Sequence, residues 1–250
     1  MERKKVAIIL PNFNSDKYLA RTLNSIVGQT FKEWQLYIVD DNSNLKTIKI
    51  LKKYKKNKKI KIFYLKKNMG AGYCRNLAIK KSKSEYLAFI DSDDLWAATK
   101  LEDQIKFMKK QNINFSYTDY KTINTRGSEI KKISVPDKFD YKTFIKNTSI
   151  ATSTMIIKRK IFKKIKFTDS KICEDFFYKC QLLKKIGYAY RLNKCLSKYR
   201  IRRDSLQSKK MRNLYWIWKI NKELNKLNIL DNLISIFFIS MNSLRKYGLK

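Results

Sequence analysis

Two acidic segments offer the clearest chemistry in this sequence. Asp91-Ser92-Asp93-Asp94 follows the strand-like run 85–90, and Asp40-Asp41 ends the apolar run 34–39. Two carboxylates one residue apart in a turn can face one ligand, and Mg²⁺ and Mn²⁺ prefer oxygen ligands that include phosphate. The segment 91–94 therefore predicts a site for a divalent metal and a nucleotide diphosphate. The alternative is structural: Asp91 caps its strand and Asp94 caps the next helix.

Asp40 and Arg75 are suited to binding a nucleoside. A carboxylate accepts hydrogen bonds from sugar hydroxyls and ring N–H groups, although Asp40-Asp41 also fits an ordinary turn. Arg75 follows the glycine-bearing loop 68–72, where a guanidinium can pair with an anion or stack on a ring. Its alternative is a place on the helix surface. The sequence lacks GxGxxG and GxxxxGK[ST], so neither a dinucleotide loop nor a P-loop is predicted.

A third acidic pair, Glu174-Asp175, opens a predicted helix that reaches about Ile186 and ends at Gly187. Acids in a first turn also favour the helix dipole, which is the structural alternative for this pair. The chain contains no histidine. That absence excludes Ser-His-Asp and Cys-His catalysis and imidazole zinc sites, so a general base must be a carboxylate, lysine, tyrosine or cysteine.

The elements that must position these residues alternate along the first half of the chain. Apolar runs predict strands at 6–10, 34–39, 60–65 and 85–90. Helical spacing predicts helices at 15–29, 45–54 and 73–81, the first with Ser15 or Asn14 as N-cap. This order predicts an α/β fold with a doubly wound, mostly parallel sheet, in which ligands bind beyond the carboxyl ends of the strands.

The second half is less regular. We expect a helix at 97–110, a strand at 115–123, a turn-rich segment at 127–141, and another strand at 152–157. The last 40 residues read as helical, aromatic and basic. Two interpretations of 211–250 stay open: an amphipathic anchor lying in an anionic membrane surface, or a helical pair packed on the rest of the chain.

Charge and cysteine content bound the function further. Lysine and arginine total 57 against 21 acids, a net charge of +36, which suits a nucleic-acid-binding protein. Lysine is nevertheless spread over nearly every predicted element, as a codon bias would spread it. The four cysteines form no CxxC pair, which indicates a cytoplasmic protein with reduced thiols. The apolar runs 6–10 and 233–241 are too short for a signal peptide core and a membrane span.

Several of these segments together resemble family 2 glycosyltransferases of the GT-A fold. The likeness spans residues 5 to about 96 and includes Pro11-Asn12-Phe13-Asn14, Val39-Asp40-Asp41, Arg75-Asn76 and the Asp91–Asp93 motif. A looser likeness continues through Glu174-Asp175 and the segment from Tyr199-Arg200 to Ser205. The resemblance implies transfer of a sugar, with inversion, from a nucleotide-diphospho-sugar, with uridine expected as the nucleoside, to an acceptor hydroxyl in cell-envelope polysaccharide, lipopolysaccharide or another glycoconjugate.

The resemblance also implies roles for individual residues. Asp175 would be the general base, and Glu174 would lie beside the acceptor. Asp93, with Asp91, would hold Mn²⁺ or Mg²⁺. Arg202 would be a weaker partner of the diphosphate. The residues that would contact the nucleotide-sugar are Pro11, Asn12, Phe13, Asp40, Arg75, Asp91, Ser92 and Arg200.

Three regions follow from the resemblance. Residues 1–205 would form the catalytic domain, with a nucleotide-binding half at 1–96 and an acceptor half at 97–205, and 206–250 would be a C-terminal helical appendage. We expect a glycan or lipid-linked acceptor, no nucleic-acid partner, and a cytoplasmic protein that the anchor interpretation would place at the inner face of the membrane. The alternatives are a basic nucleic-acid-binding protein and a degenerate transferase-like scaffold. Donor hydrolysis with Mn²⁺ would distinguish the scaffold from an active transferase.

Overall fold

One sheet of ten strands organises the described part of the chain in this computed structural model, which describes residues 5–161, 165–168, 173–202 and 210–247. The main path of the sheet runs β3-β2-β1-β4-β9-β6-β10-β5, with β7 on β6 and β8 on β10. The strands are β1 Val6–Asn12, β2 Trp34–Asp40, β3 Ile60–Tyr64, β4 Tyr86–Phe89, β5 Leu95–Trp96, β6 Phe115–Ile123, β7 Glu129–Ile133, β8 Lys138–Phe139, β9 Ile156–Lys158 and β10 Ala189–Arg200.

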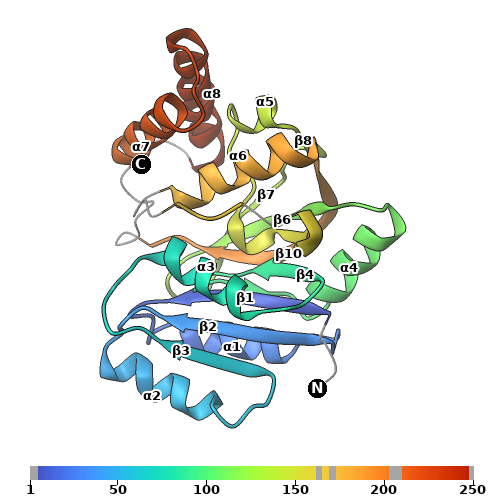
Figure 1. Ribbon diagram of the computed structural model, residues 1–250, viewed down its shortest axis with the longest axis vertical. Coiled ribbons are helices and arrows are strands. Elements are labelled where there is room, and N and C mark those ends of the chain that lie inside the picture. The colour runs from blue at the N-terminus through green and yellow to red at the C-terminus, as the bar shows by residue number, and fades with distance from the viewer. Residues whose placement is uncertain (1–4, 162–164, 169–172, 203–209, 248–250) are drawn as a thin grey trace.

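Helices cover both faces of this sheet (Figure 1). The α-helices are α1 Leu19–Val27, α2 Leu45–Tyr54, α3 Ala71–Lys81, α4 Lys100–Lys110, α5 Tyr141–Phe144, α6 Glu174–Ile186, α7 Lys210–Glu223 and α8 Ile229–Tyr247. Two short 3₁₀ turns, η1 Thr152–Thr154 and η2 Arg159–Ile161, flank β9. The predicted doubly wound, mostly parallel sheet is confirmed.

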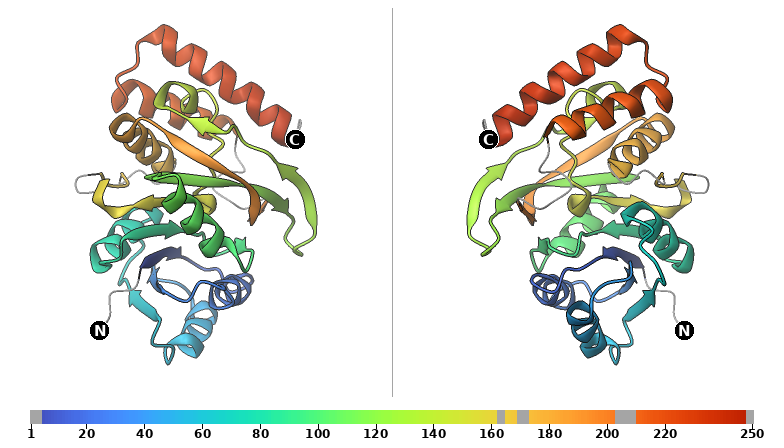
Figure 2. Two further views of the ribbon diagram at one scale, coloured as in Figure 1. Left: turned by 90° about the vertical axis from the view of Figure 1, so that its right-hand side faces the viewer. Right: turned by 90° about the vertical axis from the view of Figure 1, so that its left-hand side faces the viewer.

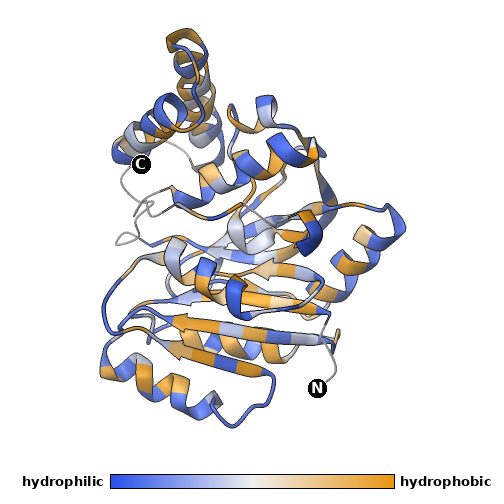
Figure 3. Ribbon diagram, in the orientation of Figure 1, coloured by the Kyte–Doolittle hydropathy of each residue, from blue (hydrophilic) through white to orange (hydrophobic). Residues whose placement is uncertain are grey.

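Alternate residues of the central strands enter two separate cores. Ala7 and Ile9 of β1 pack with α3 and α6, whereas Val6, Ile8 and Leu10 pack with α1 and α4. Successive strand side chains point to opposite faces, and both faces are covered here, so the strand is apolar at every position from Val6 to Leu10. Figure 3 shows the same concentration of hydrophobic residues along the central strands.

The carboxyl ends of β1, β2, β4, β6 and β10 lie at one edge of the sheet. β1 is parallel to β2 and β4, β9 is antiparallel to both β4 and β6, and β10 is parallel to β6. Arg200 at the end of β10 therefore reaches the same edge as Asn12 and Asp40, although more than 150 positions separate them in the sequence. We call this the carboxyl edge.

β1 continues past its predicted end because Pro11 sits where its missing N–H is harmless. Ile9 accepts a hydrogen bond from Ile90 on the β4 side, whereas Asn12 accepts one from Asp41 on the β2 side. Pro11 shares the direction of Ile9, and the pairing with β4 has already ended at Ile9. No strand hydrogen bond is lost, so the strand extends to Asn12.

The structure corrects five predicted segments. Helix α1 begins at Leu19 without a side-chain cap, because Ser15 and Asn14 bond instead to Asn12 and to the backbone of Asn44. Helix α3 begins two residues early, at Ala71, and α4 begins at Lys100 after the short strand β5. The predicted strand 152–157 is a 3₁₀ turn followed by β9. The turn-rich segment 127–141 also contains β7 and β8.

The C-terminal helices form a pair at the end of the molecule opposite α2 (Figures 1 and 2). The side-chain amide of Asn221 in α7 donates hydrogen bonds to Asn232 and Ser235 of α8. The hydroxyl of Ser235 donates a hydrogen bond of 2.6 Å to the carbonyl of Ile145, which follows α5. The helices therefore pack on the domain, as one of the two interpretations expects. The predicted boundary at 205/206 lies outside the described residues.

Candidate functional site

Arg75 is the centre of the polar cluster at the carboxyl edge. Its Nη2 donates a hydrogen bond of 2.6 Å to Asp91. Its Nη1 donates one of 2.6 Å to Glu174, which lies 99 positions later in the sequence. The arginine side chain is only 5% exposed. Burial lowers the pKa of Arg75, but Asp91, Glu174 and Asp175 outweigh burial and raise it, so the cation persists. The predicted donor and acceptor residues are thus joined by one side chain.

The turn 91–94 divides its carboxylates between open and buried positions. Asp91 and Asp93 keep 30% and 18% of their side chains exposed, whereas Asp94 is buried. Asp93 pairs with the Nε of Arg202 at 3.1 Å, and its carbonyl accepts from Arg200. Burial raises the pKa of Asp93 to about 6, with Arg202 opposing the rise and Asp91 adding to it.

Asp94 ties this turn to β10 and η1 rather than capping a helix. Its two oxygens accept from the backbone of Arg200 at 2.9 Å and from the hydroxyl of Ser153 at 2.5 Å. The next helix begins six residues later, at Lys100. The capping alternative for Asp94 is therefore wrong, because its carboxylate is used to join three separate segments.

Asp40 lies at the same edge, at the end of β2, and β1 separates this strand from β4. Its oxygens accept from Asn12 at 2.6 Å and from the backbone of Ser43 at 3.0 Å, and only 1% of the residue is exposed. The neighbouring Asp41 accepts from the backbones of Met69 and Gly70 and fixes the loop before α3. Contact of Asp40 with a nucleobase stays a prediction.

The remaining residues of the predicted nucleotide site frame this edge without joining the Arg75 cluster. Pro11 is buried, whereas Phe13 is 49% exposed just beyond β1. The carbonyl of Ser92 accepts 3.0 Å from Thr22 of α1. The Nε and Nη1 of Arg200 donate to the carbonyls of Asp93 and Asn124, and the guanidinium lies over the ring of Tyr18. Its buried Nη2 has no hydrogen-bond partner among the described residues.

Among the described residues, only one carboxylate oxygen of Asp175 accepts hydrogen bonds. Its Oδ2 accepts from Lys179 at 2.6 Å and from Thr152 at 2.8 Å, and 22% of the side chain is exposed. Burial raises the pKa of this carboxyl, but Lys179, Arg75 and Thr152 outweigh burial and lower it to about 2. Asp175 is therefore ionised at neutral pH and able to accept a proton. In Glu174, burial wins over Arg75 and raises the pKa.

The donor set of Asp91 and Asp93 fits a hard divalent cation. Mg²⁺ and Mn²⁺ bound with substrate phosphates need only one or two protein carboxylates, and both side chains here are partly open. No group of three metal-ligating side chains occurs among the described residues. Such an ion would consequently need further oxygen ligands from a diphosphate or from water.

Three residues of the cluster escaped sequence reasoning: Thr152 and Ser153 of η1, and Lys179 of α6. Ser153 donates to Asp94 and accepts from the backbone of Asp91, while Thr152 holds Asp175. The polar run 152–154 before an apolar pair was the available signal. Lys179 stands four residues after Asp175, a spacing that predicts an ion pair on one helix face.

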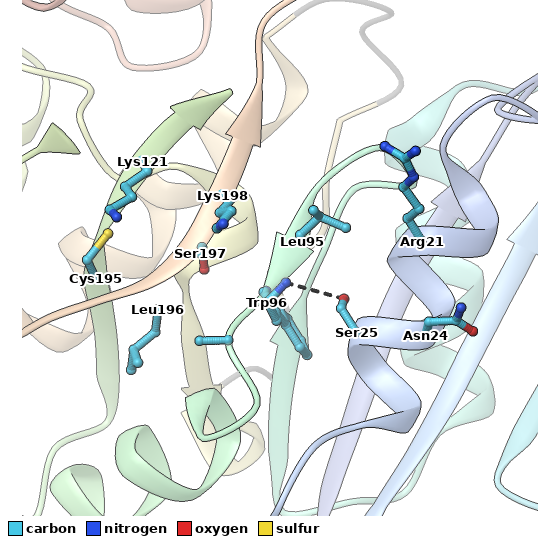
Figure 4. A pocket seen from close by; sticks show the side chains of 11 residues that line it. Arg21, Asn24, Ser25, Leu95, Trp96, Lys121, Cys195, Leu196, Ser197 and Lys198 are labelled. Atoms are coloured by element: carbon cyan, nitrogen blue, oxygen red, sulfur yellow. Dashed lines mark hydrogen bonds between the residues drawn. The ribbon is translucent and has the colours of Figure 1, made fainter. Parts of the chain in front are cut away.

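A separate cavity of about 440 Å³ lies between α1, β5 and β10 (Figure 4). Trp96, Ser25 and Lys198 are among its lining residues, and the backbone of Trp96 donates 3.3 Å to Ser25. None of the predicted site residues lines it. The candidate site therefore lies at the carboxyl edge and not in this cavity.

Sequence relatives cover almost the whole chain. A Bacillus subtilis (strain 168) protein named as a teichuronic acid biosynthesis glycosyltransferase, TuaG, is 32% identical over 243 residues, which are 96% of each chain. The Escherichia coli UDP-Glc:alpha-D-GlcNAc-diphosphoundecaprenol beta-1,3-glucosyltransferase WfgD is 32% identical over 222 residues, 88% of this chain and 86% of WfgD.

Solved structures share the fold. S. aureus TarS 1-349 in complex with UDP-GlcNAc superposes with a TM-score of 0.74 at 22% identity, covering 98% of this chain and 76% of that one. The mannosyltransferase PcManGT from Pyrobaculum calidifontis, in complex with GDP-Man and Mn²⁺, gives 0.71 at 12% identity, covering 99% and 72%. The fold is therefore that of GT-A enzymes. The model of Glycosyl transferase family 2 matches residues 7–166, and with these relatives it establishes that the chain is a glycosyltransferase of that family.

Proposed function

We propose that this glycosyltransferase moves a sugar from a UDP-sugar to a hydroxyl of a lipid-linked glycan, with inversion, in cell-envelope polysaccharide synthesis. One observation carries the proposal: Arg75 joins Asp91 of the donor motif to Glu174, the neighbour of Asp175. This contact brings a carboxylate suited to a diphosphate-bound metal near a carboxylate suited to a base. The UDP-Glc donor and diphosphoundecaprenol acceptor of WfgD, and the UDP-GlcNAc bound to TarS, support the choice of substrates.

The reaction needs one base and one leaving group. Asp175 takes the proton of the acceptor hydroxyl while that oxygen forms a bond to the anomeric carbon of the donor. The bond from this carbon to the diphosphate oxygen breaks at the same time, and the nucleotide leaves with the electron pair. Attack from the side opposite the leaving group inverts the anomeric centre. No histidine and no covalent intermediate are required.

The donor would lie along the carboxyl edge. Pro11, Asn12, Phe13 and Asp40 surround the nucleoside end, and Ser92 and Arg200 lie toward the diphosphate. Asp93 and Asp91 would hold Mn²⁺ or Mg²⁺, which would neutralise charge on the departing diphosphate. In this proposal residues 1–96 serve the nucleotide, and 97–205 carry Glu174 and the acceptor.

Contact with an anionic membrane is the second part of the proposal. α8 presents exposed apolar side chains at helical spacing: Ile229, Leu230, Leu233, Phe237 and Leu244. The net charge of +36 and the exposed Lys146, 6.0 Å from the ring of Phe238, favour negatively charged lipid. No helix of the described residues is long and apolar enough to cross a membrane. The four free cysteines fit a position at the cytoplasmic face.

A donor screen tests the central part of the proposal. We expect one UDP-sugar, in the presence of Mn²⁺, to raise the melting temperature and to be transferred to a GlcNAc-diphosphoundecaprenol acceptor. Asp93→Ala should remove the metal-dependent part of the stabilisation. Asp137→Ala, at a carboxylate 86% exposed and distant in sequence from the motif, is the matched control and should keep it. Transfer without any nucleotide-sugar dependence would contradict the proposal.

A further inference from the structure

Lys179 is a buried lysine placed against the candidate base. Its side chain is 4% exposed, and its Nζ lies 2.6 Å from Oδ2 of Asp175 and 3.0 Å from the hydroxyl of Thr152. Thr152 itself donates 2.8 Å to the same Oδ2. These three groups form a closed triangle between α6 and η1. Among the described residues, Oδ1 of Asp175 accepts no hydrogen bond.

The hydrogen bonds to Oδ2 of Asp175 fix the direction of its other oxygen, Oδ1. A carboxylate with one oxygen fixed by two donors cannot rotate, so its other oxygen has a defined direction. The side chain of Asp175 remains 22% exposed although its two partners are buried. A proton acceptor in a transferase needs this arrangement, because a misplacement of about 1 Å can cost about 100-fold in rate.

We propose that Lys179 and Thr152 are positioning residues for the general base: they hold Oδ2 of Asp175 so that Oδ1 meets the acceptor hydroxyl. The proposal rests on the role of Asp175 in the proposed function. The proton moves from the acceptor oxygen to Oδ1, the acceptor oxygen bonds to the anomeric carbon, and the diphosphate takes the electrons of the broken bond. Neither Lys179 nor Thr152 exchanges a proton in this step.

Lys179 also decides the charge balance around the base. Within the part of the chain that the structure describes, the ionisable groups that face Asp175 are Glu174 beside it, Arg75 from α3, Cys173 before the helix, and Lys179 and Cys180 from within it. Burial and Glu174 both disfavour a second negative charge, and Arg75 is already shared by Glu174 and Asp91. Removal of Lys179 would thus leave burial dominant and raise the pKa of Asp175.

The simpler view is that this is an ordinary i,i+4 ion pair that stabilises α6. An ion pair with a purely structural role lowers the melting temperature when it is broken, but it leaves the pH dependence of kcat unchanged. A positioning role changes kcat and its acid limb while the KM for the donor stays constant. The two views therefore separate on the pH profile of turnover.

The experiment compares Lys179→Met, Lys179→Arg, Thr152→Val and Thr152→Ser in the full chain, with Lys185→Met on the exposed side of α6 as the matched control. We expect Lys179→Met to lower kcat at pH 8 about 10-fold and to move its acid limb to higher pH, because burial would then raise the pKa of Asp175 without the opposing Lys179 cation. Lys179→Arg should restore part of both. Thr152→Val should lower kcat about 10-fold, and Thr152→Ser should recover it.

Wild-type kcat and an unmoved acid limb in Lys179→Met would overturn the proposal. If Lys179→Met does not fold, Thr152→Val tests the proposal instead. A kcat of Thr152→Val equal to that of the wild type would also overturn it. A different result would reject the proposed function itself: Asp175→Asn would retain transfer. If Asp175→Asn is inactive while Lys179→Met and Thr152→Val keep the wild-type kcat, only the positioning role is rejected.

Discussion

At the scale of single residues, the contacts of Arg75 make the turn 91–94 and the pair Glu174-Asp175 depend on one cation. Each of its terminal nitrogens binds a different carboxylate at 2.6 Å, and the guanidinium also lies 5.3 Å from the ring of Phe167. A buried cation with two charged partners is costly to disturb, because either carboxylate would be left desolvated. The side chain therefore serves the architecture of the site whether or not it also touches a nucleotide.

Asp175→Asn tests the base at this scale. The amide keeps the shape of the side chain but cannot take a proton, so we expect transfer to fall by about 10²–10⁴-fold while donor binding is retained. The measurement is initial-rate transfer alongside calorimetric binding of the donor. Transfer at the wild-type rate would show that another group is the base.

The acid dependence of stability follows from the same carboxyl. The folded pKa of Asp175 is about 2, below that of an unfolded aspartate, so its contribution is complete above pH 4 and is lost as the pH falls toward 2. We expect the difference in the free energy of unfolding between wild type and Asp175→Asn to shrink over that interval. Urea unfolding at pH 6, 4 and 3 measures this difference, and a constant difference would contradict the ion pair.

At the scale of elements, η1 and α3 bring the two halves of the chain together. Thr152 and Ser153 are adjacent, yet one holds Asp175 and the other holds Asp94. α3 approaches the 165–168 segment at Gly72, where an added Cβ would lie 2.5 Å from the carbonyl of Thr168. Glycine at this helical position is therefore required by the neighbouring chain and not by its own backbone angles.

Gly72→Ala measures this close approach. The new methyl group must displace the backbone near Thr168, and overpacking of this kind costs about 1–3 kcal/mol. We expect a melting temperature lower by about 2–10 °C and weakened donor binding, because α3 also carries Arg75. Gly28→Ala is the control: its Cβ meets a carbonyl only at 3.2 Å and φ is −74°, so its effect should be small. Equal losses in both variants would contradict the account.

The central elements were predictable from the sequence because local signals and the tertiary fold agree there. Apolar runs gave β1 to β4, and the acids after β2 and β4 marked the edge where the site lies. The strand expected at 152–157 failed because Thr152 and Ser153 satisfy distant carboxylates, which no local pattern records. The pairing of Lys179 with Asp175 was readable from spacing, whereas the double contact of Arg75 depends on α6 docking against α3.

At the scale of the whole molecule, positive charge and an apolar stripe are combined with an acidic site. Ser235 of α8 contacts the domain at Ile145, and Asn232 contacts α7. Leu233 and Phe237 of the same helix are exposed by 53% and 59%. Packing on the domain and the proposed contact with a membrane are thus compatible, because they would use different faces of one helix. The lipid-linked acceptor of the proposed function would give such a stripe a purpose.

Leu233→Glu/Phe237→Glu tests contact with lipid. Two carboxylates on the stripe should oppose entry into the interface, and we expect loss of sedimentation with anionic vesicles and unchanged binding of the donor. Val27→Glu/Leu45→Glu makes the same change in charge at exposed apolar residues of α1 and α2 and should sediment as the wild type does. Equal sedimentation of both double variants would contradict the membrane role, and binding to DNA of either would revive the nucleic-acid alternative.

The contact between Gly72 and Thr168 restricts how this chain can be recombined with its relatives. Under the proposed division into a donor half, 1–96, and an acceptor half, 97–205, a chimera of two enzymes would be cut near residue 97. This cut separates Gly72 and Arg75 from Thr168 and Glu174. Such a hybrid would inherit a helix from one parent and its facing surface from the other. Exchange of specificity in this enzyme therefore requires that α3 be transferred together with α6.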